Sequence, residues 1–325
     1  MRGLPTLILV VAAALALFFI DRLNAYWIHV AIIAMFYGIL ASSWSLLAGY
    51  AGLFSLGHMA FASVGGYTSA LLVQWYGIPV PLGMAAGIAV CCALGAAVGW
   101  VCLRMSGPYL AIFTLGFAEI VRITFSTEDE VTAGMGGLHT VPLFDSTSRL
   151  PYFYTAFVLL AASLAIMGWI VHSRWGLFLR AIREDEQAAA ASGVAVARFR
   201  ILVFAIASGF AGLAGVFYAH YIPILTPSIG SLDFMAVLVV MTVIGGMERL
   251  PTAVGGAFAV EFLLEALRDY GQWRLPLFGI ILLLTMRFAR NGLLTPLWLA
   301  LMRLGEMRRA AVAAVREAGP TDSPA

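Results

Sequence analysis

The sequence predicts an all-α integral membrane protein, a polytopic bundle of about 8–10 transmembrane helices. Three observations carry this prediction. Of the 325 residues, 62% are hydrophobic and 11% are charged, whereas soluble domains average about 25% charged residues. The mean hydropathy is +0.95. Long apolar segments recur along the chain, and most approach the roughly 20 residues that a bilayer span needs.

Ten segments are candidate spans. The third is interrupted by glycines, and the eighth and tenth are short, features that are typical of re-entrant or discontinuous membrane segments. The number of full spans therefore stays open. In order, the candidates are residues 3–20, 27–48, 54–75, 80–103, 107–126, 151–172, 200–220, 232–247, 251–268 and 276–289.

The first candidate span resembles a signal peptide, because Arg2 precedes an apolar run at residues 3–20. A cleavable signal peptide ends in a small-residue site of the A-x-A type. Here Asp21 and Arg22 follow the run instead. We therefore expect a retained span.

Arginine positions predict the orientation, because basic residues concentrate in cytoplasmic loops. All 19 basic residues are arginine, and they are dense in the 173–200 connection and in the C-terminal tail. Four candidate spans separate these regions, an even number, so both are expected in the cytoplasm. The same count places the N-terminus in the cytoplasm and the acidic 127–150 loop outside. The arginines are Arg174, Arg180, Arg183, Arg198 and Arg200 in the connection, and Arg290, Arg303, Arg308, Arg309 and Arg316 in the tail.

The residue content excludes several kinds of chemistry. Without lysine, the chain has neither the lysine of a Walker A loop nor a Schiff-base lysine. Cys91, Cys92 and Cys102 lack CxxC spacing, so packing is their favoured role. Aspartate and histidine are too few and too scattered for an intramembrane enzyme.

Small residues predict where helices approach closely. Lipid supplies no hydrophobic drive between helices, so small side chains let backbones pack. The fourth candidate span has a small residue at every fourth position, and the seventh pairs small residues four apart. Such stripes occur in transporters, channels and membrane enzymes alike. The residues are Gly83, Gly87, Cys91, Gly95 and Gly99 in the fourth span, and Ser208, Ala211, Gly212 and Gly215 in the seventh.

The stretch at residues 49–72 is rich in glycines that do not share one helix face. They suit either a broken helix whose freed carbonyls line a polar path or a tight helix crossing. Both interpretations stay open. Two of the glycines precede the third span and three interrupt it: Gly49 and Gly52, then Gly57, Gly65 and Gly66.

Ionisable side chains inside spans are functional candidates by default, since a charge at a helix centre costs about 2.5–3.5 kcal/mol on insertion scales. Glu119 and Arg122 are three residues apart, as are Glu265 and Arg268, so each set can pair on one helix face. Neutralised pairs are the favoured interpretation. His58 either lines a path or hydrogen-bonds a neighbouring carbonyl, and the structural role is favoured.

The stretch RAIREDEQAAAASG at residues 180–193 predicts a short helix in solvent between two spans. Alanine is the best helix former, charged residues crowd the start, and Gly193 can end the helix as a C-cap. The segment is too polar to cross lipid. Its small-residue half either fits a groove on another protein or belongs to a plain surface connector.

Five stretches in the same order resemble the permease subunits of ABC importers for branched-chain amino acids, the LivM-type family. The resemblance covers most of the chain, and it implies a transporter subunit that is not an enzyme. The stretches are SLGH at 55–58 with GGY at 65–67, RMSGPYLAIFTLGFAE at 104–119, TAGMGGL at 132–138, RAIREDEQAAAASG at 180–193 and SGFAGLAGVFYA at 208–219.

The resemblance implies that the 180–193 helix docks on an ATPase. ABC importer permeases have an EAA-type loop, E-A-A followed four positions later by G, that enters a groove of the ATPase subunit. This chain departs from the pattern at Gln187, where the motif has glutamate. The implied coupling residues are Arg180, Arg183, Glu184, Gln187, Ala188, Ala189 and Gly193.

A second departure lies in the 245–256 loop, where related chains have a glycine and a small hydroxyl residue near Glu248 and Arg249. The glycine and ionisable-residue patterns described above make Ser55, Gly57, His58, Gly65, Gly66 and Glu119 the candidate pathway residues, and the small-residue spacing makes Gly83, Gly87, Gly95, Gly99, Gly212 and Gly215 the candidate packing residues.

As a whole, the chain is expected to be one permease domain at residues 1–310, with a cytoplasmic coupling loop at 173–199, an external loop at 127–150 and a disordered cytoplasmic tail at 311–325. The resemblance implies a bacterial plasma (inner) membrane location. Expected partners are a second homologous permease subunit in a heterodimer, two ATPase subunits that carry ATP and Mg, and an external or periplasmic binding protein. No cofactor in this chain and no nucleic acid are expected.

Two other functions remain as alternatives. A related ABC importer for urea or another small solute shares most of these motifs. A secondary transporter is less favoured, because its ion-coupling carboxylates would have to be Glu119 or Glu261, the only candidates in mid-span.

Overall fold

The computed structural model describes residues 24–105, 107–146, 148–273, 276 and 279–280, and the structural statements that follow concern these residues. The predicted first span at 3–20 and the predicted tail at 311–325 lie outside them. So do most of the tenth candidate span and the arginines from Arg290 onward.

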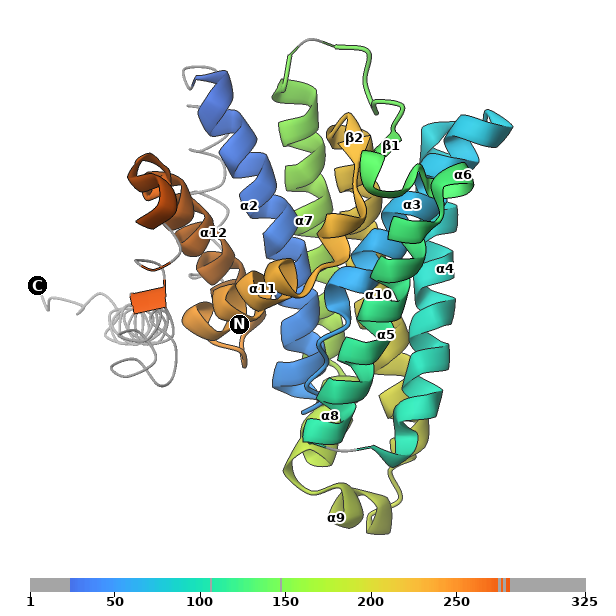
Figure 1. Cartoon of the computed structure of the whole chain (residues 1–325). Helices are drawn as coiled ribbons and strands as arrows, with labels where there is room; N and C mark the ends of the chain where they lie inside the picture. Colours follow the sequence, from blue (N-terminus) through green and yellow to red (C-terminus); the bar gives the residue numbers. More distant parts are fainter. Residues whose placement is uncertain (1–23, 106, 147, 274–275, 277–278, 281–325) are drawn as a thin grey trace, which may run out of the picture.

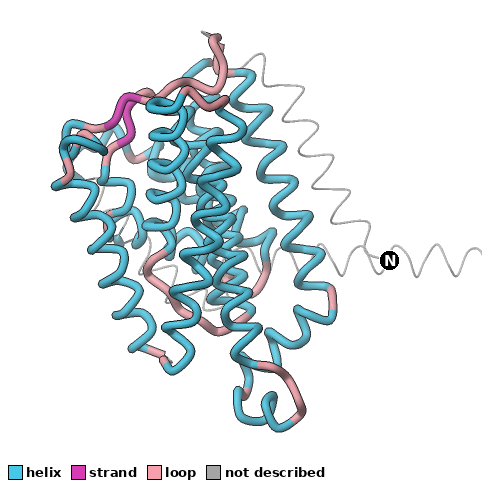
Figure 2. Tube along the Cα trace, turned by 90° about the vertical axis from the view of Figure 1, so that its right-hand side faces the viewer, coloured by secondary structure: helices cyan, strands magenta, loops and turns pink. Residues whose placement is uncertain are grey.

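Most of the described chain is helical, which confirms the all-α prediction (Figure 2). The larger helices follow candidate spans two to nine, and their ends differ from the predicted ends by at most four residues. They are α2 (Ala25–Trp44) with a π-helical extension η2 (Ser45–Tyr50), α3 (His58–Tyr76), α4 (Val80–Val101), α5 (Pro108–Thr127), α7 (Leu150–His172), α10 (Val196–Tyr221), α11 (Leu232–Gly245) and α12 (Leu250–Ala266).

Shorter elements lie in the connections between these helices. They are α6 (Asp129–Thr132), α8 (Arg174–Glu184) and α9 (Glu186–Ala191), the 3₁₀ turns η3 (Cys102–Arg104), η4 (Gly134–Gly136), η5 (Pro227–Gly230) and η6 (Arg268–Trp273), and the strands β1 (Leu138–His139) and β2 (Ile224–Leu225).

Proline and glycine mark several helix ends. Pro108, Pro151 and Pro251 lie in the first turns of α5, α7 and α12, where a backbone N–H has no helical partner and its loss costs nothing. Gly77 follows α3 in the left-handed region, with φ of 62°, and its N–H donates to the carbonyl of Val73 at 3.1 Å. These local signals explain why the helix ends could be predicted closely.

The helices form two packed groups (Figure 1). In one group, α10 packs against α3 and α4, which also pack on each other, and α5 lies against α3. In the other group, α2 packs against α12 and α7, and α11 packs against α12. Contacts between α2 and α10 join the two groups.

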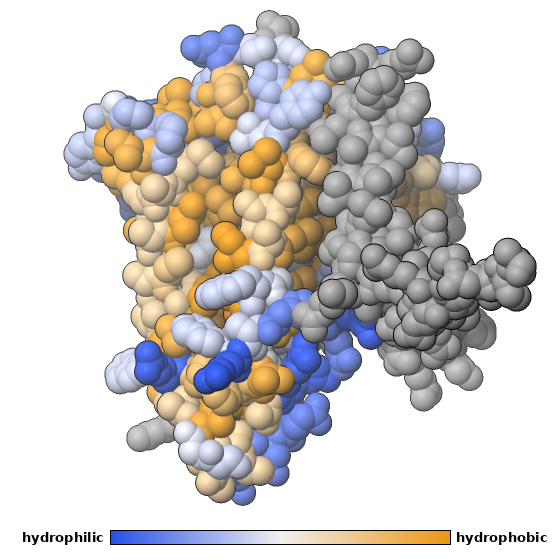
Figure 3. Space-filling model, turned by 180° about the vertical axis from the view of Figure 1, so that it is seen from behind, coloured by the Kyte–Doolittle hydropathy of each residue, from blue (hydrophilic) through white to orange (hydrophobic). Residues whose placement is uncertain are grey.

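Five of the described helices are long and apolar enough to cross a membrane. Apolar residues cover the middle of the face seen in Figure 3, and hydrophilic residues gather toward the two ends. Both observations fit a membrane protein. The five are Ala25–Tyr50, which joins α2 and η2, Val80–Val101, Pro108–Thr127, Leu150–His172 and Val196–Tyr221.

The predicted eighth segment is a short helix. α11 has 14 residues, which rise about 21 Å, less than the roughly 30 Å of a hydrocarbon core. It lies obliquely among the long helices (Figure 1). α11 therefore does not extend the full height of the bundle.

The 127–150 connection is more ordered than an open loop. It contains α6 and η4, and its strand β1 pairs antiparallel with β2 from the connection between α10 and α11. This sheet lies at the end of the bundle opposite α8 and α9 (Figures 1 and 2). The sequence did not predict it. The register places Leu138 opposite Leu225 and His139 opposite Ile224.

Candidate functional site

The predicted single helix at 180–193 is in fact two helices, which corrects the sequence analysis. α8 ends at Glu184 and α9 begins at Glu186, and between them Asp185 has extended backbone, with φ of −155° and ψ of 109°. Its carboxylate accepts hydrogen bonds from the N–H groups of Gln187 and Ala188, both at 2.9 Å. Aspartate favours this N-cap position because it satisfies N–H groups that a helix start leaves unpaired. We call residues 174–193 the α8–α9 unit.

Gly193 follows the C-terminus of α9, as the sequence predicted. Its φ is 86°, in the left-handed region that favours glycine. Its N–H donates to the carbonyl of Ala190 at 3.0 Å, and the N–H of Val194 donates to the carbonyl of Ala189 at 3.1 Å. This pair of bonds is the Schellman arrangement. The short α9 is therefore capped at both ends.

The residues of the predicted docking motif face different ways. Gln187, Ala188 and Gly193 are exposed, whereas Ala189 is only 5% exposed and packs into the protein. The surface that this motif offers to a partner therefore comes from Gln187 and Ala188. Ala189 instead packs α9 against the rest of the protein. The predicted α8 residues Arg180, Arg183 and Glu184 are exposed.

Arg200 joins α9 to the bundle. This arginine, near the start of α10, is 5% exposed. Its guanidinium contacts the carboxylate of Glu186 at 2.9 Å and donates to the carbonyls of Leu103 at 3.2 Å and Met105 at 2.5 Å. The carbonyls belong to the connection between α4 and α5. In the sequence, Arg200 served only as an orientation signal, and no local pattern predicts this contact.

Arg183 and Arg180 join α8 to other parts of the chain. The guanidinium of Arg183 donates to the carbonyl of Gly49 and pairs with the carboxylate of Glu248. The guanidinium of Arg180 lies over the ring of Tyr50, 5.3 Å from its centroid. The unusual Glu248 of the 245–256 loop therefore contacts the α8–α9 unit.

The predicted pathway residues Ser55, Gly57 and His58 lie at the non-helical segment that precedes α3. All three are buried. His58 is the first residue of α3, and its Nε2 is 2.8 Å from the hydroxyl of Ser43. The hydroxyl of Ser55 accepts from the N–H of Gly57 at 3.2 Å, and the indole of Trp44 donates to the Ser55 carbonyl at 2.8 Å. The histidine partner is thus a hydroxyl, where a carbonyl was the expectation.

Gly65 and Gly66 lie within an unbroken α3, so the helix does not break at these glycines. A Cβ on Gly65 would lie 2.8 Å from the Cα of Gly212, and a Cβ on Gly66 would lie 3.0 Å from the carbonyl oxygen of Gly215. Of the two open interpretations, the structure contains the tight helix crossing, between α3 and α10. The helical interruption lies earlier, at residues 51–57.

The predicted packing glycines lie where helices approach most closely. The buried stripe of α4 faces α3 and α10, and the small residues of α10 face α3 and α4. An added Cβ would meet a neighbouring atom within 3 Å at each position. The neighbours are Val73 for Gly83, the Gly65 carbonyl for Gly87, Ser208 for Gly95, Phe204 for Gly99, Cys91 for Gly212 and the Ala62 carbonyl for Gly215.

Glu119 and Arg122 form the predicted ion pair on α5. Arg122 Nε donates to Glu119 Oε2 at 2.9 Å, and a second contact joins their remaining atoms. Both side chains are partly exposed, at 45% for Glu119 and 30% for Arg122. The same helix has strongly exposed apolar residues, Tyr109, Ile112 and Ile120. α5 therefore presents an open face with a charged pair beside apolar residues.

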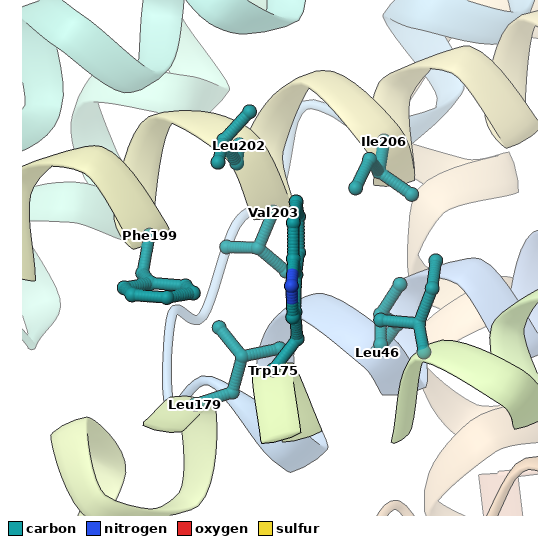
Figure 4. Close-up of a pocket in the computed structure, with 8 residues that line it drawn as sticks. Leu46, Trp175, Leu179, Phe199, Leu202, Val203 and Ile206 are labelled. Carbon is teal, nitrogen blue, oxygen red and sulfur yellow. The ribbon is translucent and has the colours of Figure 1, made fainter. Parts of the chain in front are cut away.

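A small apolar pocket lies where α8 packs on α10 (Figure 4). Trp175 of α8 contacts Phe199 of α10 edge to face, with ring centroids 5.9 Å apart. The lining supplies almost no hydrogen-bonding groups, so the pocket suits packing of the α8–α9 unit and not binding of a polar solute. Its residues are Leu46, Ile170, Trp175, Leu179, Phe199, Leu202, Val203 and Ile206.

Comparison with known proteins links the fold to a transport family. Residues 26–289 match the family described as "Branched-chain amino acid transport system / permease component". The chain is 29% identical over 299 residues to the high-affinity branched-chain amino acid transport system permease protein LivM of Salmonella typhimurium, and 28% identical over 295 residues to LivM of Escherichia coli. Each match covers 82% of this chain and 69% of the relative.

More distant likenesses include another import permease. The fructose import permease protein FrcC of Rhizobium meliloti is 25% identical over 227 residues, which cover 65% of this chain and 63% of that protein. Among solved structures, PsaBC from Streptococcus pneumoniae in complex with Fab is 15% identical, with a TM-score of 0.47 over 86% of this chain and 97% of that one. The profile match spans most of the chain, and the chain therefore belongs to the permease family of branched-chain amino acid transport systems.

Proposed function

We propose that this chain forms part of the translocation pathway of an ABC importer for branched-chain or other hydrophobic amino acids. Its family and its LivM relatives support the substrate class. ATP and Mg would bind separate ATPase subunits, since a chain without lysine has no Walker A lysine. An external binding protein would deliver the amino acid, and the assembly would lie in the bacterial plasma membrane.

The α8–α9 unit is the observation that best supports this role. It presents a small exposed surface at Gln187 and Ala188 on a capped helix, and Arg200 joins this helix to the bundle. A groove of an ATPase subunit can accept such a helix end. Closure of the ATPases on ATP would then displace the unit and move the bundle between outward-open and inward-open states. This requires that the ATP-bound subunits bind one state more tightly than the other.

The open face of α5 supports a second permease subunit as the partner. Ile112 and Ile120 are each 67% exposed, beside the Glu119–Arg122 pair. A charged pair is costly in lipid, so we assign this face to the second permease and the pathway between the two chains. The subunit would be homologous, and the pair a heterodimer.

The acidic end of the bundle is our candidate contact for the external binding protein. Glu128, Asp129 and Glu130 are exposed, and they lie in the connection whose strand β1 pairs with β2, opposite the α8–α9 unit (Figure 1). Reversal of these charges is expected to weaken uptake that depends on the binding protein. Unchanged uptake would exclude this contact.

Another cargo is the main alternative. The match to a fructose import permease shows that similar chains occur in importers of polar solutes. A urea or small-solute importer would have the same ATPase contact, so only the cargo distinguishes it. A secondary transporter would carry solute in liposomes without any ATPase.

The docking role predicts a specific effect of Ala188→Trp. The indole would fill the exposed surface of α9 without disturbing the bundle, because Ala188 is exposed. We expect ATPase subunits to bind at least tenfold more weakly, a loss of about 1.4 kcal/mol in binding free energy, and therefore to be lost from the purified complex, with a fall in uptake. The measurement is co-purification in mild detergent together with uptake in proteoliposomes.

The matched control is Ala162→Trp, at an exposed alanine of α7. It makes the same change in a transmembrane helix, away from the α8–α9 unit, and should retain the ATPase subunits. Ala189→Trp is a poorer test, because Ala189 is buried and its substitution disturbs packing. Full ATPase recovery with Ala188→Trp would exclude docking at this surface.

A further inference from the structure

Two segments that are distant in sequence lie against each other beside α8. The hydroxyl of Ser45 in η2 donates to the carbonyl of Met247, in the connection between α11 and α12, at 2.6 Å. A Cβ on Gly49 would lie 1.9 Å from the same carbonyl oxygen. The two backbones are therefore in direct contact, and only glycine fits at position 49.

Arg183 contacts both of these segments at once. One arm of its guanidinium donates to the carbonyl of Gly49, and the other pairs with the carboxylate of Glu248. Its aliphatic stem lies against Gly52, where an added Cβ would lie 3.0 Å from Arg183 Cγ. A single side chain of α8 thus spans η2 and the α11–α12 connection.

Each segment leads directly into the bundle. η2 continues through residues 51–57 to α3, and the N–H of Leu56 on the way donates to the hydroxyl of Thr114 in α5 at 2.9 Å. Glu248 lies between the end of α11 and the start of α12. Arg183 therefore contacts two segments that lead into α3, α11 and α12.

The two arginine contacts of the unit differ in burial. The Arg200 side chain is 6% exposed, and its removal takes the donor away from two partly buried carbonyls. The Arg183 side chain is 33% exposed and Glu248 is 68% exposed. An exposed ion pair contributes only about 0–1 kcal/mol to stability. The Arg183–Glu248 pair thus contributes little to the stability of the fold.

We propose that Arg183 is a positioning residue that transmits movement of the α8–α9 unit to η2 and to the α11–α12 connection. It couples ATPase docking to rearrangement of the bundle, and Glu248 is its partner on the second segment. This inference rests on the proposed transport function and adds a specific residue to it. The docking surface at Ala188 is a separate feature, on α9.

The test is Arg183→Ala in the full complex with its ATPases and binding protein, reconstituted in proteoliposomes. Uptake and ATP hydrolysis are measured on the same preparation, and co-purification reports assembly. We expect the ATPases to remain bound and the ATP hydrolysed per solute transported to rise about fivefold or more, the lower range of allosteric coupling. Arg174→Ala, at an exposed arginine on the same helix, is the control and should leave this ratio unchanged.

Two further variants separate coupling from a merely structural role. Arg183→Lys keeps the charge, but an ammonium lacks the planar guanidinium that can reach two acceptors at once. We therefore expect an ATP-to-solute ratio between those of the unaltered complex and Arg183→Ala. Glu248→Ala should also raise the amount of ATP hydrolysed per solute transported. The double variant Arg183→Ala with Glu248→Ala should show the same ATP-to-solute ratio as Arg183→Ala alone, because the effects of mutating two residues in contact do not add.

An unchanged ATP-to-solute ratio in Arg183→Ala would overturn the inference. Loss of the ATPases from the Arg183→Ala complex would overturn it as well, because Arg183 would then be a docking residue. Failure of the unaltered complex to transport in response to ATP is a different result. It would reject the proposed function itself, before any variant is compared.

Discussion

Replacement of Arg200 by methionine should destabilise the protein strongly. Arg200 is 5% exposed, and its guanidinium pairs with Glu186 and donates to two backbone carbonyls. Breaking a buried pair costs about 3–5 kcal/mol. Because Glu186 is 48% exposed and can be hydrated when unpaired, we expect a loss of stability at the lower end of this range, about 3 kcal/mol. At about 2 °C per kcal/mol for a large domain, the melting temperature should fall by about 6 °C.

The assay is thermal unfolding of the purified chain in one detergent at one scan rate, followed by tryptophan fluorescence. Arg198→Met is the matched control, because Arg198 lies two residues earlier and is exposed. Its effect should stay within about 0.5 kcal/mol, as for ordinary surface substitutions. Equal melting temperatures for the Arg200 and Arg198 variants would refute the role of Arg200.

Two further predictions concern glycines. Gly215→Ala should sharply reduce the yield of monodisperse protein on size exclusion, because the added Cβ would lie 1.9 Å from the carbonyl oxygen of Ala62. Gly116→Ala is the control and should be tolerated, since no neighbour lies within 4 Å of its added Cβ. Equal yields of the two variants would contradict the crossing of α3 and α10. Gly193→Ala should cost about 1–2 kcal/mol, because the residue must keep a left-handed conformation. Faster amide hydrogen exchange is expected in 186–191 but not in the middle of α10, and unchanged exchange in both would contradict the proposed cap.

Local patterns predicted the helices and the surfaces by which they pack. The apolar segments placed eight helices within four residues of their described ends, because length and hydropathy set a membrane helix with little help from distant residues. The four-residue spacing of small residues in α4 marked the face that packs on α3 and α10. The spacing of small residues in α4 did not identify α3 and α10 as the partner helices, because the residues on one helix face do not specify which other helix packs on it.

The contacts that fix the α8–α9 unit could not be predicted from local patterns. Arg200 contacts carbonyls 97 and 95 residues away, and Arg183 contacts one 134 residues away. Such pairs form only after the bundle has brought the segments together. The break at Asp185 is a different case. Its N-cap signal was present in the sequence, but the alanine run that follows favoured one continuous helix.

The small sheet shows a similar limit. β1 and β2 each contain two residues, too few for an alternating pattern to appear in the sequence. The two strands lie in different connections, one after α5 and one after α10. The β1–β2 pairing links the 127–150 connection, which we expect to contact the binding protein, with the segment that leads into α11. The 127–150 connection and the α8–α9 unit therefore both reach the group of helices that contains α11 and α12.

The central claim is that this chain carries amino acids as a subunit of an ATP-driven importer. The most direct test is uptake of labelled leucine into proteoliposomes that contain the chain, its second permease and the ATPase subunits, with the binding protein outside and ATP supplied inside. We predict accumulation that requires both ATP and the binding protein, and that excess unlabelled leucine, but not urea, suppresses. Accumulation by the chain without any ATPase, or none with all components present, would contradict the claim.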